Sequence, residues 1–167
     1  YFGSADGHLY CVSLKNGSIL WAFAAAGPIQ VSPCVYEGQV LGISLEGDLF
    51  ALDAGDGRLN WTYRSQAVAA SFACADSGNI FLATEIKIVC LDSQSGKLLW
   101  QQEVGPTIAA NLAVRGNQLL AAQGGSAQTL AVLSFDVRTG DRLWNRTREE
   151  VVERTSISAS NENIYFA

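Results

Sequence analysis

CLDSQSGKLLW, residues Cys90–Trp100, reads as a short apolar strand, a polar turn that ends in glycine, and a second strand that finishes in tryptophan. The pattern occurs three more times in the 167 residues, in Cys11–Trp21, Ala51–Trp61 and Ser134–Trp144. In all four copies glycine stands four residues before tryptophan, and the pairs are Gly17/Trp21, Gly57/Trp61, Gly96/Trp100 and Gly140/Trp144. Aspartate stands eight residues before tryptophan in three copies, as Asp53, Asp92 and Asp136, and Ser13 takes that place in the fourth. The tryptophans are 40, 39 and 44 residues apart, so the chain is a repeat protein.

Each residue of the pattern has a physical reason. Glycine lets a tight connection between antiparallel strands adopt a positive φ at no steric cost. Aspartate or serine before the turn accepts hydrogen bonds from the turn N–H groups. Tryptophan supplies a large flat apolar surface with one N–H to satisfy, which suits it to fill the gap between one sheet and the next.

The pattern of apolar runs and turn residues predicts four short strands per repeat, joined by tight turns as a β-meander. One full unit reads as strands over Ile29–Tyr36, Gln39–Leu45, Asp48–Asp53 and Arg58–Tyr63. Tyr1 aligns in phase with Tyr165, which makes the chain about four repeats long. The predicted repeats are 1–27, 28–65, 66–104, 105–148 and 149–167, with the first and last partial.

Meanders of this length fit an all-β fold, the β-propeller, whose four-stranded antiparallel blades pack radially. A β-sandwich predicts neither the period nor the tryptophan register. A flat array of such sheets leaves apolar faces open at both ends, so we expect ring closure or further blades in a larger ring of seven or eight.

Composition excludes several classes of function. Charged residues make up 16% of the chain, compared with about 25% in an average soluble domain, and 49% of residues are hydrophobic. The net charge is −5 and no basic cluster exists, so nucleic acid is not an expected partner. No apolar run approaches the ~18 residues of a membrane span. The chain opens at Tyr1 in mid-strand, as a piece of something longer would.

The Ala-x-Asp-x-x-x-Gly-x-x-x-Trp pattern of Ala51–Trp61 resembles the tryptophan-docking motif of the PQQ-like (quinoprotein) repeat family. Tyr1–Tyr10 resembles the strand–turn–strand of that family, and Ser32–Val35 resembles its inner strand. The resemblance covers all four repeats and implies a β-propeller, commonly eight-bladed. It is specific for the fold and weak for activity, because the same repeat serves enzymes and binding modules.

The resemblance raises the hypothesis of a PQQ-dependent dehydrogenase, which holds the quinone on the propeller axis with a calcium ion, an aspartate base and often a vicinal disulfide. Calcium requires several converging carboxylate and carbonyl oxygens. Here no two cysteines are adjacent, and the predicted inner strands Ile29–Tyr36, Val68–Ala75 and Thr107–Val114 contain no aspartate. Only Glu149–Arg154 concentrates charge near an inner strand, and we interpret it as a solvated connection.

His8 is the only histidine, which excludes a His-based metal cluster or a Ser-His-Asp triad within the chain. The cysteines form repeat-equivalent pairs, Cys11 with Cys90 and Cys34 with Cys74, and we interpret them as small buried thiols. Equivalent positions in separate blades should lie too far apart for a disulfide. Free thiols favour a reducing compartment such as the cytosol, with a periplasmic or secreted location left open.

The sequence therefore predicts a non-catalytic propeller that acts as a protein-interaction or substrate-presenting scaffold within a larger protein. Its expected partners are proteins or neighbouring domains of the same polypeptide, and no cofactor is expected. One alternative is part of a PQQ-dependent dehydrogenase whose PQQ and Ca²⁺ site lies mostly outside the chain, and a second is a small-ligand sensor. Non-enzymatic relatives of this kind include a bacterial outer-membrane assembly lipoprotein and the propeller of the β-alanine-activating enzyme, an acyl-adenylate-forming protein. Gly27–Cys34 and the cysteine usage resemble the latter.

Overall fold

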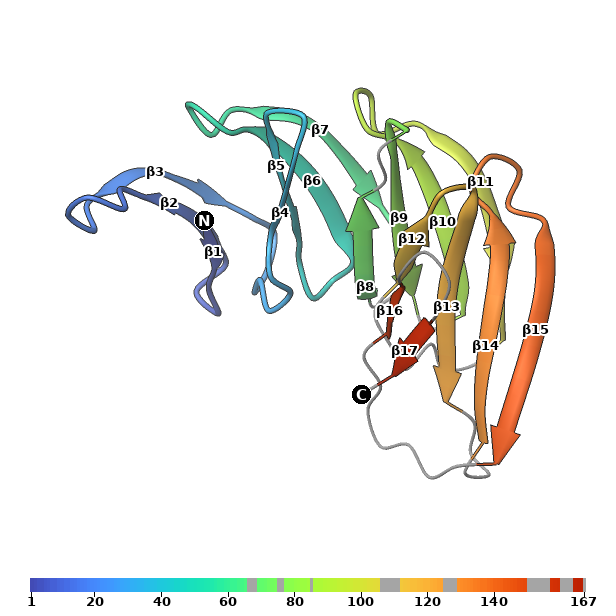
Figure 1. The fold of residues 1–167 in the computed structure, drawn as a ribbon. Helices are drawn as coiled ribbons and strands as arrows, with labels where there is room; N and C mark the ends of the chain where they lie inside the picture. The colour runs from blue at the N-terminus through green and yellow to red at the C-terminus, as the bar shows by residue number, and fades with distance from the viewer. Residues whose placement is uncertain are drawn as a thin grey trace. The chain divides into compact units, whose positions relative to one another are not determined.

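The computed structural model describes residues 1–65, 69–74, 77–84, 86–105, 112–124, 129–149, 157–159 and 164–166. Every regular element in these residues is a β-strand, and every strand pairing with a described register is antiparallel. The chain divides into two compact units, Tyr1–Ala69 and Ala70–Ala167. In each unit, strands that follow one another in sequence lie side by side as meanders (Figure 1).

The first unit contains two sheets. A three-stranded sheet has the order β1 (Phe2–Gly3), β2 (His8–Val12) and β3 (Ile19–Ala24). A four-stranded sheet has the order β4 (Cys34–Tyr36), β5 (Gln39–Ile43), β6 (Asp48–Asp53) and β7 (Leu59–Arg64). The meander follows from the turns, because each connection inside a sheet is too short for a crossover.

The second unit repeats the scheme. One four-stranded sheet contains β8 (Ala69–Cys74), β9 (Asn79–Thr84), β10 (Lys87–Asp92) and β11 (Leu98–Glu103). Another contains β12 (Ala113–Arg115), β13 (Gln118–Gly124), β14 (Thr129–Asp136) and β15 (Arg142–Glu149). A two-stranded sheet pairs β16 (Ile157–Ala159) with β17 (Ile164–Phe166). The all-β fold predicted from the repeat is confirmed.

The predicted strand Ile29–Tyr36 is wrong over its first part, since only Cys34–Tyr36 pairs as β4. Pro33 has no N–H to donate to a ladder, and this removes the pairing at that point. The backbone upstream is used differently: the Ile29 N–H donates to the Ser4 carbonyl at 3.0 Å, and the Pro28 carbonyl accepts from the Leu45 N–H at 2.9 Å. The segment thus joins the turns of two sheets. The first residues of the predicted strands Val68–Ala75 and Thr107–Val114 lie outside the described part of the chain.

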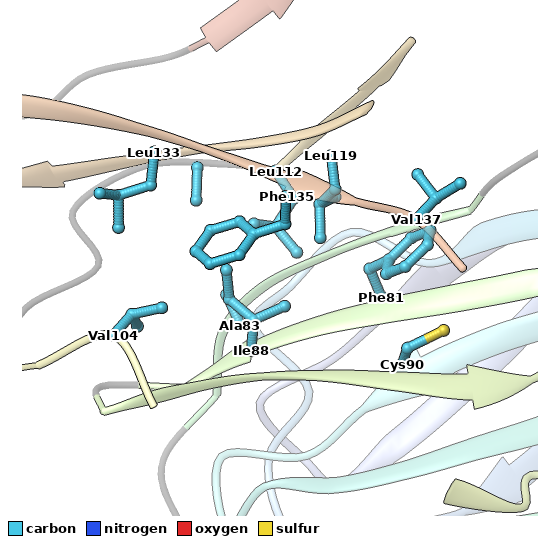
Figure 2. Packing of buried hydrophobic residues seen from close by; sticks show 11 residues of the cluster. Phe81, Ala83, Ile88, Cys90, Val104, Leu112, Leu119, Leu133, Phe135 and Val137 are labelled. Carbon is cyan, nitrogen blue, oxygen red and sulfur yellow. The ribbon is translucent and has the colours of Figure 1, made fainter. Parts of the chain in front are cut away.

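Each unit buries its apolar side chains between two neighbouring sheets. In the first unit one such buried cluster is Leu9, Ile29, Val40, Phe50 and Leu52. In the second unit, side chains of β9 and β10 face those of β13 and β14, as Figure 2 shows. Phe81 and Phe135 are completely buried there, and each such burial contributes about 1.5–3 kcal/mol relative to exposure.

Candidate functional site

The four repeated turns, which we call docking turns, have one shared backbone geometry. They are Ser13–Gly17, Asp53–Gly57, Asp92–Gly96 and Asp136–Gly140. Their closing glycines have φ of 72°, 73°, 66° and 76° in chain order, which L side chains adopt only with strain. In each turn the glycine N–H donates to the carbonyl of the first turn residue, at 2.8–2.9 Å. The turn is therefore a closed loop, and a residue without a Cβ belongs at its end.

The carboxylates of the docking turns bind the backbone of their own turns. Asp53 Oδ1 accepts from the N–H groups of Gly55 and Asp56, at 2.8 and 3.2 Å. Asp92 Oδ1 accepts from the N–H of Ser95 at 2.8 Å and from its hydroxyl at 2.5 Å. Both hydrogen bonds lower the pKa of Asp92, and the one from the Ser95 hydroxyl has the larger effect.

Asp136 is held in the same way. Its Oδ1 accepts from the N–H groups of Arg138 and Thr139, at 2.8 and 3.1 Å, and its Oδ2 accepts from the Asn117 amide. These bonds, with that from Arg138 first, lower the pKa of Asp136. Hydrogen bonds to the charged form stabilise it, so Asp92 and Asp136 act as ionised acceptors that organise their turns.

Two tryptophans pack on the docking turn of the following sheet. A Cβ placed on Gly57 would lie 2.6 Å from Trp21 Cδ2, and one placed on Gly140 would lie 2.7 Å from Trp100 Cδ2. The indole N–H groups bond to the same turns: Trp21 Nε1 donates to the Ala54 carbonyl at 3.3 Å, and Trp100 Nε1 donates to the Val137 carbonyl at 3.0 Å. Glycine is thus required at Gly57 and Gly140 for two reasons: the backbone has a positive φ, and the indole lies too close for a side chain. Trp61 is buried and Trp144 is half-buried.

A second ring beside the docked tryptophan was not anticipated from the sequence. Tyr1 lies 5.5 Å from Trp21 between ring centroids, and its hydroxyl donates to the Ala54 carbonyl at 2.9 Å. Phe81 lies 5.7 Å from Trp100. The repeat register could have indicated this neighbour, because Tyr1 and Phe81 hold equivalent positions relative to Trp21 and Trp100.

A small residue stands opposite each tryptophan across the ladder. The register pairs are Cys11 with Trp21, Ala51 with Trp61, Cys90 with Trp100 and Ser134 with Trp144. The ladder shifts register immediately after each of these small residues. The sequence comparison of Cys11 and Cys90 with Ala51 therefore reflects a shared packing position.

The cysteines at this position are buried thiols. Cys11 and Cys90 are free and buried, and burial raises the pKa of Cys90 to about 12. A thiol with so high a pKa is almost entirely protonated at neutral pH and is a poor nucleophile. Cys34 is half-buried, and the side chain of Cys74 lies outside the described residues.

His8 flanks a turn, as its position after Gly7 suggested. Its Nδ1 lies 3.3 Å from the Asp6 carbonyl and 3.4 Å from Asp6 Oδ1, and its ring stacks on Tyr10 with centroids 5.7 Å apart. Tyr10 in turn donates its hydroxyl to Asp6 Oδ2 at 2.8 Å. These contacts fix the turn Asp6–Gly7.

A calcium ion that holds a quinone would need several oxygen ligands around one point. Among the described residues, no three Asp, Glu, His or Cys side chains gather closely enough to hold a metal ion. The repeated aspartates already bind their own turns, so they do not converge on a common point. The charged stretch Glu149–Arg154 lies outside the described side chains.

In the part of the chain that the structure describes, no helix has the length and apolar character needed to cross a membrane.

Comparison with known proteins agrees with the fold. The family model described as "Outer membrane protein assembly factor BamB" matches residues 1–167. The outer membrane protein assembly factor BamB of Yersinia pestis is 26% identical over 159 residues, which cover 87% of this chain and 40% of that protein. The beta-alanine-activating enzyme of Danio rerio is 37% identical over 62 residues, which cover 33% of this chain and 5% of that protein. The chain thus spans less than half the length of these relatives.

Solved structures show the same architecture. BamB from Moraxella catarrhalis superposes with a TM-score of 0.69 at 18% identity, covering 98% of this chain and 65% of that one. A europium-containing methanol dehydrogenase superposes with a TM-score of 0.68 at 21% identity, covering 83% of this chain and 29% of that one. At these identities the likeness concerns the fold. The chain belongs to the outer membrane protein assembly factor BamB family of PQQ-like β-propeller repeats.

Proposed function

We propose that this chain is a non-catalytic β-propeller segment of a larger protein, and that it serves outer membrane protein assembly as a scaffold for protein partners. The role in outer membrane protein assembly is taken from the names of the relatives. The docking turns support a scaffold role, because each combines a constant backbone framework with exposed residues that vary between repeats.

That combination is the observation that carries the proposal. The first residue and the closing glycine of each turn vary little between repeats, and both form hydrogen bonds within the turn. Aspartate or serine accepts from the turn backbone, and the glycine N–H closes the loop. The two residues just before each closing glycine are exposed and differ between repeats; they are Lys15-Asn16, Gly55-Asp56, Gln94-Ser95 and Arg138-Thr139. Variable loops on a rigid scaffold are a common basis of recognition.

We propose equally that PQQ and Ca²⁺ are not resident cofactors of this chain. A hard cation needs several oxygen ligands around one point. The repeated carboxylates instead accept hydrogen bonds from their own turns, and their lowered pKa values at Asp92 and Asp136 have local causes. A PQQ-dependent dehydrogenase would therefore need its calcium ligands from residues other than these carboxylates. No described residue singles out a binding site for a small-ligand sensor.

Genetic complementation tests the scaffold proposal. The intact protein that carries this chain is expressed in a bacterium from which the endogenous assembly factor has been deleted, and outer membrane proteins are quantified in purified membranes. We expect their levels to rise towards those of the undeleted strain. A variant in which Lys15, Asn16, Arg138 and Thr139 are replaced by serine should fold but restore less. Levels that stay at the deletion baseline, with the protein folded and correctly localised, would contradict the proposal.

A further inference from the structure

Asn16 and Gly17 form the only Asn-Gly pair in the sequence. Every other asparagine precedes a residue with a side chain. Glycine leaves its own backbone nitrogen unhindered, because it has no side chain. Attack of that nitrogen on the preceding asparagine side chain is the first step of deamidation, so the sequence marks Asn16 as the position where this reaction is least hindered.

Asn16 lies at the exposed tip of the first docking turn. Its exposure does not depend on whether a tryptophan packs on Gly17. Asp56 and Thr139 hold the equivalent position in the two turns on which a tryptophan does pack, and both are exposed. Water therefore reaches the Asn16 side chain in either case.

Ser18 places two hydrogen-bond donors on the side-chain oxygen of Asn16. Its N–H donates to Asn16 Oδ1 at 3.1 Å, and its hydroxyl donates to the same atom at 2.9 Å. When a nucleophile attacks Cγ of an asparagine, negative charge develops on Oδ1, and donors that are already in place stabilise this charge. The backbone contact recurs in the second turn, where Asp56 Oδ1 accepts from the Arg58 N–H at 3.0 Å. The hydroxyl is particular to the first turn, because the equivalent residues of the others are Arg58, Lys97 and Asp141.

We propose that Asn16 is a deamidation site, at which the turn itself promotes formation of a cyclic imide. The Gly17 backbone nitrogen bonds to Asn16 Cγ, the Cγ–Nδ2 bond breaks, and the Gly17 amide proton leaves with the side-chain nitrogen as ammonia. Water then opens one of the two imide C–N bonds, which yields aspartate or isoaspartate. The Gly17 N–H also donates to the Ser13 carbonyl at 2.8 Å. This bond must open before the nitrogen attacks, so the modification accumulates slowly with the age of the protein.

The aspartate product is compatible with the fold of the turn. The second turn already has Asp56 before Gly57, and Asp56 Oδ1 accepts from the N–H two residues on, as Asn16 Oδ1 does. Deamidation gives the first tip the charge that the second tip carries, and makes the chain one unit more negative than its formal −5. The proposal is independent of the scaffold role, because it concerns chemistry within one turn.

The test is incubation of the intact protein that carries this chain at mildly alkaline pH, with its peptides mapped by mass spectrometry over time. At Asn16 we expect the mass gain of an amide converted to an acid, with isoaspartate in the same peptide. Asn16→Ser introduces the residue that Ser95 provides in the third turn, and should abolish this gain. Ser18→Ala removes one donor and should slow the reaction by about two- to tenfold, which is the effect of a single hydrogen bond.

Thr139→Asn is the matched control, because it places the same dipeptide before Gly140 in the fourth turn. There Asp141 stands in place of Ser18, and a carboxylate accepts hydrogen bonds but donates none. The introduced asparagine should therefore deamidate more slowly than Asn16 in the same molecule. Circular dichroism establishes that each variant is folded. Equal rates at the two positions would overturn the proposal, as would an Asn16 that keeps its amide in the folded protein, or an unchanged rate in Ser18→Ala.

Discussion

The contact between Trp21 and Gly57 predicts an unusually large effect for the addition of one methyl group. In Gly57→Ala the new Cβ would lie 2.6 Å from Trp21 Cδ2, so the indole or the turn must shift. Overpacking of this kind costs typically about 1–3 kcal/mol. Alanine at φ +73° adds about 1–2 kcal/mol for the left-handed backbone. The free energy of unfolding should therefore fall by about 2–5 kcal/mol.

Gly38→Ala separates the two contributions. Gly38 has φ +77° but nothing within 4 Å of its Cβ position, so only the backbone cost of about 1–2 kcal/mol applies. Urea unfolding followed by tryptophan fluorescence gives both values, provided that the slope with denaturant stays constant. Gly140→Ala, which faces Trp100 at 2.7 Å, should behave like Gly57→Ala. Equal losses in Gly57→Ala and Gly38→Ala would refute the inference that the docked indole is what excludes a side chain.

Three further predictions follow from individual groups. Cys90, whose pKa burial raises to about 12, should resist iodoacetamide in the native protein at pH 8 and react only on unfolding, as mass spectrometry of the labelled chain would show. Asp92 and Asp136 have pKa values below the unfolded value of about 3.9, so their contribution to stability is present above that pH and is lost as the pH falls through their folded pKa values. Acid unfolding of an Asp92→Asn/Asp136→Asn variant should accordingly show a weaker dependence on pH below about 4 than the unaltered protein. The buried Ser134 hydroxyl has no hydrogen-bond partner in the described part of the chain, and Ala51 occupies the equivalent place, so Ser134→Ala should raise the free energy of unfolding by about 1 kcal/mol in urea titrations.

Local sequence was sufficient to predict the strand order, because the signals for a meander are local. Gly17, Gly57, Gly96 and Gly140 mark turns that only a residue tolerant of positive φ can close, and the structure gives all four a positive φ. The capping role expected of Asp53, Asp92 and Asp136 is also a contact within five residues. Repetition made these short-range signals reliable.

The sequence predicted that tryptophan fills the gap between sheets, but which residues meet across that gap could not be predicted in the same way. That Trp21 docks on Gly57 of the following sheet, and not on a turn of its own sheet, depends on how two sheets pack and leaves no trace in spacing alone. The same holds for Tyr1 beside Trp21. The error at Ile29–Pro33 has a related origin, because the apolar run looked like a strand while its backbone groups were bonded to neighbouring turns.

The central claim, that the chain keeps the architecture of the repeat without quinone chemistry, is tested most directly by calorimetric titration of PQQ, with Ca²⁺ present, into the intact protein that carries this chain. Dye reduction with a panel of alcohols and sugars is followed in the same samples. We predict no heat of binding at micromolar PQQ and no turnover. Stoichiometric binding with substrate-dependent dye reduction would contradict the claim and identify the protein as a quinoprotein oxidoreductase.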